Sequence, residues 1–69
     1  MEIDKEIGYK QGEAAALGNI GLIYRSKGDA DNALKYLKQA LEIAKKYKFK
    51  FLEKKIKFSL DEIKNKNSQ

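Results

Sequence analysis

The sequence predicts an all-α protein: one small domain over residues 1–69, built from an antiparallel helical hairpin and a capping helix. Its 69 residues provide enough chain for a single domain. Proline is absent, while lysine, glutamate, alanine and leucine are abundant, so little in the chain opposes helix formation. Apolar residues also recur at spacings of three and four in three successive segments, which is the period of an amphipathic helix.

The first predicted helix spans residues 9–27. Leu17, Ile20, Gly21 and Tyr24 line one side of it at helical spacing. A glycine inside a helix costs about 1 kcal/mol relative to alanine. We therefore expect another backbone to approach this helix closely at Gly21.

The second predicted helix spans residues 29–46 and follows a tight turn at Gly28. Glycine suits the left-handed conformation that ends a helix, and Asp29 suits the N-cap of the next one. A narrow face of small and aliphatic residues follows, made by Ala30, Ala33, Leu34, Leu37, Ala40, Leu41 and Ala44. We expect this face to pack closely against the first helix.

The third predicted helix spans residues 47–64, and residues 65–69 are expected to fray. One apolar stripe is made by Phe49, Leu52, Ile56, Leu60 and Ile63. Tyr47, Phe51 and Phe58 fall on the opposite side, where they would form a larger apolar patch than a small monomer normally exposes. We predict that these three aromatic residues mediate homo-oligomerisation, end to end or by helix exchange. The alternative is that the N-terminal segment folds back over them.

A weak internal repeat with an offset of 40 residues is also present. It pairs Glu2 with Glu42, Ile3 with Ile43, Lys5 with Lys45, Lys10 with Lys50, Glu13 with Glu53, Ile20 with Leu60 and Ile23 with Ile63. This offset predicts that residues 1–8 are the tail of a helix from a preceding unit, and that residues 47–64 are a degenerate first helix of a following unit.

Residues 14–47 resemble the tetratricopeptide repeat. The large, small and turn positions that carry the resemblance are Leu17, Ile20, Gly21, Tyr24, Gly28, Asp29, Ala33, Leu37, Ala40 and Leu41. The resemblance implies right-handed stacking of helical hairpins, with one full repeat and a half-repeat on each side. The 40-residue period is similar to the extended-helix repeats of kinesin light chains and of polarity and quorum-sensing scaffolds. The third helix lacks the glycine and tyrosine of a repeat start, so we interpret it as a terminal cap or as an element remodelled to contact something else.

The resemblance implies a protein or peptide partner, held as a peptide or helix on a concave face. The residues expected to make contacts on that face are Asn19, Leu22, Arg25, Ser26 and Lys55. The amide of Asn19 offers both a donor and an acceptor for a peptide backbone. The alternative is that Asn19 simply faces solvent. Chaperone-binding members of the family bind a carboxylate with a lysine four residues before this asparagine. This chain has Ala15 there, so we do not expect such a carboxylate clamp.

The basic charge of the chain is concentrated in its last third. Residues 45–69 carry a net charge of +6, whereas residues 1–44 carry −1. Such a run usually forms a solvated helix face, but a basic amphipathic helix could instead bind nucleic acid or an anionic membrane surface. We expect neither nucleic acid nor a membrane as the partner, and the single arginine in the chain argues further against nucleic acid. Binding to nucleic acid would weaken steeply with salt, whereas an interface made by Phe51 and Phe58 would depend little on it.

Composition excludes several kinds of chemistry. The chain has no cysteine and no histidine, which removes disulfides, thiolate nucleophiles, imidazole acid–base catalysis and the usual zinc ligands. We expect no enzyme activity, no cofactor and no metal site. The sequence has no long apolar segment, and we expect a cytoplasmic protein. The identity of the partner, and whether these residues form part of a longer repeat array or a natural miniature protein, stay open.

Overall fold

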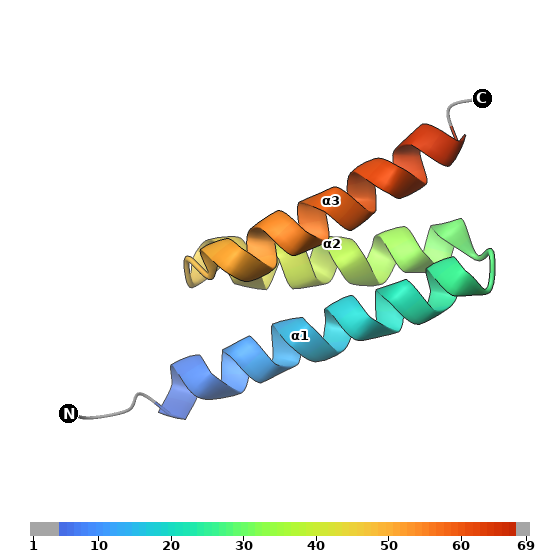
Figure 1. The fold of residues 1–69 in the computed structure, drawn as a ribbon. Coiled ribbons are helices and arrows are strands. Elements are labelled where there is room, and N and C mark those ends of the chain that lie inside the picture. Colours follow the sequence, from blue (N-terminus) through green and yellow to red (C-terminus); the bar gives the residue numbers. More distant parts are fainter. Residues whose placement is uncertain (1–4, 68–69) are drawn as a thin grey trace.

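The computed structural model describes residues 5–67 and forms three α-helices. They are α1 (Lys5–Ser26), α2 (Ala30–Lys46) and α3 (Lys50–Asn67). Figure 1 shows α1 and α2 as an antiparallel hairpin, with α3 returning along α2 in the same general direction as α1. The described residues contain no strand, so the predicted all-α fold is confirmed.

The bounds of α1 and α3 differ from the expected ones. Helix α1 starts at Lys5, so residues 5–8 continue it instead of forming the end of a preceding helix. Helix α3 starts only at Lys50 and extends to Asn67, because residues 47–49 form a turn. Residues 1–4 of the expected preceding helix, and residues 68–69 of the expected frayed tail, lie outside the described residues.

The turn between α1 and α2 has the geometry that its sequence predicts. Gly28 has φ +83°, and the N–H of Asp29 donates to the carbonyl oxygen of Tyr24 at 2.9 Å. This bond spans the turn in the manner of a Schellman motif. The carboxylate of Asp29 then accepts a hydrogen bond from the N–H of Asn32 at 3.2 Å, which caps α2.

The turn between α2 and α3 repeats this geometry without its usual residues. Lys48 takes the left-handed position, with φ +59°, and the N–H of Phe49 donates to the carbonyl oxygen of Ala44 at 2.8 Å. Phe49 precedes α3 as Asp29 precedes α2, but it has no side-chain acceptor to cap the helix. A lysine in this conformation is strained relative to glycine.

Helices α1 and α2 approach each other closely at Gly21, as expected. A Cβ atom built on Gly21 would lie 2.7 Å from Cγ of Leu37 and 3.1 Å from the carbonyl oxygen of Ala33. Nearer the turn, the rings of Tyr24 and Tyr36 stack with centroids 5.5 Å apart. Glycine at residue 21 therefore allows the two helices to pack at this distance.

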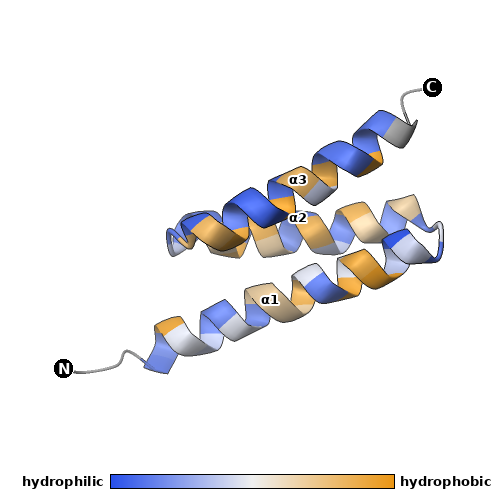
Figure 2. Ribbon diagram, in the orientation of Figure 1, coloured by the Kyte–Doolittle hydropathy of each residue, from blue (hydrophilic) through white to orange (hydrophobic). Residues whose placement is uncertain are grey.

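The core lies where α2 contacts both of its neighbours. Its buried residues are Ala33, Leu37, Ala40, Ala44, Ile56, Leu60 and Ile63. Figure 2 shows α3 as a largely hydrophilic helix with hydrophobic segments interspersed along it. None of the described helices is both long enough and apolar enough to span a bilayer.

Candidate protein-binding groove

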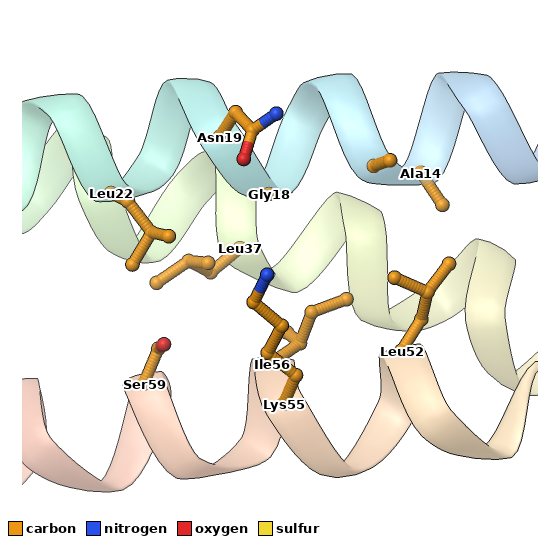
Figure 3. Close-up of a pocket in the computed structure, with 10 residues that line it drawn as sticks. Ala14, Gly18, Asn19, Leu22, Leu37, Leu52, Lys55, Ile56 and Ser59 are labelled. Carbon is orange, nitrogen blue, oxygen red and sulfur yellow. The ribbon is translucent and has the colours of Figure 1, made fainter.

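A groove runs between α1 and α3, with α2 as its floor. It contains a hollow of about 130 Å³, lined by Ala14, Ala15, Gly18, Asn19, Leu22, Leu37, Leu52, Lys55, Ile56 and Ser59. Figure 3 shows Leu22 directed from α1 towards α3, and Lys55 directed from α3 towards α1. All three helices therefore contribute to one site.

Small residues on α1 keep the groove open. Ala14 and Gly18 are buried and present almost no side chain to α3. A Cβ atom on Gly18 would be 4.0 Å from Cγ1 of Ile56, which is an ordinary van der Waals separation. Unlike Gly21, Gly18 could therefore carry a Cβ atom without a clash, and it is one of the residues that line the hollow.

The opposite wall of the groove is amphipathic. Leu52 and Ile56 of α3 provide an apolar surface that meets Leu37 at the floor. Ser59 is buried, and its hydroxyl is directed towards α1 (Figure 3). Lys55 is exposed at the rim and is the charged member of the lining set. The hollow thus combines an apolar interior with a positive edge.

Three of the five expected contact residues, Asn19, Leu22 and Lys55, line this hollow. The other two do not. Nη1 of Arg25 donates a hydrogen bond to Oε1 of Glu62 at 2.9 Å, which links α1 to α3. Ser26 is exposed at the last residue of α1.

The sequence interpretation did not assign Leu37, Leu52 and Ile56 to the groove. Each was assigned only to the apolar side of its own helix. The structure shows that the same apolar surface continues from the core into the hollow. The sequence feature that could have indicated the groove is the pair of small residues Ala14 and Gly18 on α1. Small residues that face large ones leave a cavity unless the two helices move closer together.

The aromatic residues of α3 lie outside the groove. Phe51 is 82% exposed and Phe58 is 67% exposed. The ring of Tyr47 is half-buried and stacks on Phe49, with centroids 5.8 Å apart. Tyr47 is therefore less available than the two phenylalanines. Lys50 and Lys54 are neighbours of Phe51 along a second, shallow hollow.

Comparison with protein families identifies a match over most of the chain. The family model described as tetratricopeptide repeat matches residues 1–47. The chain belongs to the tetratricopeptide repeat family. Separate comparisons with curated proteins and with solved structures gave no significant match.

Membership in the tetratricopeptide repeat family indicates a protein–protein interaction module of a kind that is typically non-catalytic. The match covers α1 and α2 and ends in the turn before α3. Helix α3, which forms one wall of the groove, therefore lies outside the segment that matches the tetratricopeptide repeat family.

Proposed function

We propose that this chain binds a peptide segment of a partner protein in the groove between α1 and α3. The observation that supports this proposal is the hollow of about 130 Å³ at the junction of the three helices. An engineered apolar cavity of about 150 Å³ is large enough to hold benzene. The hollow is therefore of a size for one aliphatic or aromatic side chain, and is smaller than the pockets of roughly 300–1,000 Å³ that hold most small-molecule ligands.

Three residues supply the proposed contacts. Leu22 packs against the side chain that enters the hollow. Asn19 donates to and accepts from the peptide backbone, because its amide carries both functions. Lys55 pairs with an acidic group next to the buried side chain. Arg25 contributes less, because its guanidinium already pairs with Glu62.

Selection from a displayed library of random peptides tests this proposal. We expect the recovered peptides to share one leucine, isoleucine or phenylalanine beside an aspartate or glutamate. Asn19→Ala should weaken binding by about 2- to 12-fold, the loss of one hydrogen bond. Lys55→Glu should reverse the charge preference of the selected peptides.

Asn65→Ala is the matched control, because Asn65 is another exposed asparagine that does not line the hollow. It should leave peptide affinity unchanged. Peptides that bind the Asn19 and Lys55 variants as tightly as the original chain would refute the proposal. Equal weakening by all three substitutions would refute it as well.

We also propose that the chain self-associates through α3, because Phe51 and Phe58 expose most of their ring area. The two residues are seven positions apart, so they lie on one side of the helix. Tyr47 would add contacts at the edge of this face. The interface is apolar, so the association should depend little on salt, although Lys50 and Lys54 lie beside it.

Light scattering over a hundredfold range of concentration tests the self-association. We expect a dimer or larger species that dissociates on dilution, and a monomer when Phe51 and Phe58 are both replaced by serine. Helicity measured by circular dichroism should be unchanged in that variant, since neither ring is in the core. A chain that stays monomeric over the whole range would contradict this proposal.

A further inference from the structure

A run of exposed lysines covers the turn between α2 and α3 and the first half of α3. Its members are Lys45, Lys46, Lys48, Lys50, Lys54, Lys55 and Lys57, and every one of these side chains is exposed. Between residues 45 and 58 the sequence has one acidic residue, Glu53. Most of this segment follows residues 1–47, which match the tetratricopeptide repeat family, so the match does not account for its charge.

Two exposed phenylalanines lie in the middle of this basic surface. Phe51 and Phe58 are about 20° apart around α3, at 100° per residue. Lys54 lies about 50° to one side of the pair, and Lys55 lies about 50° to the other side. The buried residues of α3 are on the opposite side of the helix, and they are Ile56, Leu60 and Ile63. The outward side of α3 is therefore a narrow apolar strip with lysines along both edges.

The acidic residues of α3 lie away from Phe51. Glu53 is on the far side of the helix from Phe51, and it pairs with Lys57 at 3.1 Å. Asp61 and Glu62 come only after the second phenylalanine. Positive charge therefore predominates along the first half of α3.

We propose that the outward side of α3 docks on an anionic membrane surface. The rings of Phe51 and Phe58 enter the boundary between headgroups and acyl chains, and the lysines on both sides meet the negative headgroups. Charge complementarity selects this occupant, because a second copy of the chain would cover the rings without bringing negative charge to the lysines. The sequence alone did not favour a membrane, since it does not show whether the rings are covered. In the structure both side chains are mostly exposed.

This proposal goes beyond peptide binding in the groove, and it gives the exposed rings a use that competes with self-association. The same rings cannot be buried in lipid and against a second copy at once. The groove stays separate, because Ser59, which lines it, lies about 90° around α3 from the two phenylalanines. Docking on lipid therefore leaves the groove to one side of the contact.

Sedimentation of the chain with lipid vesicles tests the proposal. We expect binding to vesicles made of equal parts of phosphatidylserine and phosphatidylcholine, and none to vesicles of phosphatidylcholine alone. Binding should weaken as salt is added, because screening reduces the attraction to the headgroups. Lys50→Gln together with Lys54→Gln should weaken it about 30-fold. Phe51→Ser together with Phe58→Ser should weaken it about tenfold or more.

Lys27→Gln together with Lys38→Gln is the matched control, because it removes the same charge from exposed lysines outside α3. It should change vesicle affinity by less than about threefold. Light scattering without lipid then separates this proposal from self-association. The variant that lacks Lys50 and Lys54 should associate as the original chain does, because an apolar interface depends little on charge.

Three results would overturn the proposal. The first is equal binding to anionic and neutral vesicles, or binding to neither. The second is equal weakening by the two pairs of lysine substitutions. The third is a single-stranded oligonucleotide that binds more tightly than the anionic vesicles, which would assign the lysines of α3 to nucleic acid instead.

Discussion

Replacing Gly21 by alanine tests how closely α1 and α2 approach each other. The added Cβ atom would lie 2.7 Å from Cγ of Leu37 and 3.1 Å from the carbonyl oxygen of Ala33. Cγ is the branch carbon of a buried leucine, and the carbonyl belongs to the backbone of α2. Neither atom can move away without displacing the helix or the core around it.

Gly12→Ala is the matched control, because a Cβ atom on Gly12 meets nothing within 4 Å. Both glycines are inside α1, so each alanine gains about 1 kcal/mol of helix propensity. Only the substitution at Gly21 also incurs overpacking, which costs roughly 1–3 kcal/mol. The difference between the two variants therefore isolates the cost of the close contact.

Thermal unfolding followed by circular dichroism measures this difference. For a domain of this size, 1 kcal/mol corresponds to a Tm shift of about 4–8 °C. We expect Gly12→Ala to melt above the original chain, and Gly21→Ala to melt roughly 5–20 °C below Gly12→Ala. If the two alanines raised Tm equally, the close approach at Gly21 would be refuted.

Three further predictions concern the turns and the link across the groove. Residues 28 and 48 both have positive φ, which glycine adopts more easily than other residues. Lys48→Gly should therefore stabilise the fold by about 0.5–1 kcal/mol, and Gly28→Ala should destabilise it by about 1–2 kcal/mol. Urea unfolding in which both substitutions change the stability in the same direction would contradict this. Asp29→Ala should cost about 1 kcal/mol by removing the cap of α2, and an unchanged urea midpoint would show that the cap is dispensable. The side chains of Arg25 and Glu62 are both more than a third exposed. A double-mutant cycle should therefore give a coupling free energy of no more than about 1 kcal/mol that decreases as salt is added. A larger coupling free energy that does not change with salt would contradict a surface ion pair.

The hairpin was predictable from local sequence signals. The apolar face of residues 30–44 and the turn at Gly28 each have a residue-level cause, namely helical spacing and the freedom of glycine at positive φ. The start of α3 was less predictable, because Lys48 is not a residue that normally marks a turn. Its left-handed conformation belongs to the turn in which the N–H of Phe49 donates to the carbonyl oxygen of Ala44, and a lysine does not signal that geometry.

The candidate groove was predictable only in part, for a geometric reason. Helical periodicity places Asn19, Leu22 and Lys55 on the correct sides of their own helices. It does not specify how α3 lies relative to α1. That relative position determines that Arg25 reaches Glu62, and that Leu52 borders the hollow.

The composition of the buried interface has a consequence for how the chain folds. Ala33, Ala40 and Ala44 of α2 are fully buried, as is Ala14 of α1. Alanine has no side-chain rotamers to lose, so bringing α1 and α2 together costs little side-chain entropy. Alanine also buries little hydrocarbon, and apart from Leu37 the large aliphatic residues of the buried core come from α3. Hairpin and third helix should therefore unfold together in one transition, because neither buries enough apolar surface without the other.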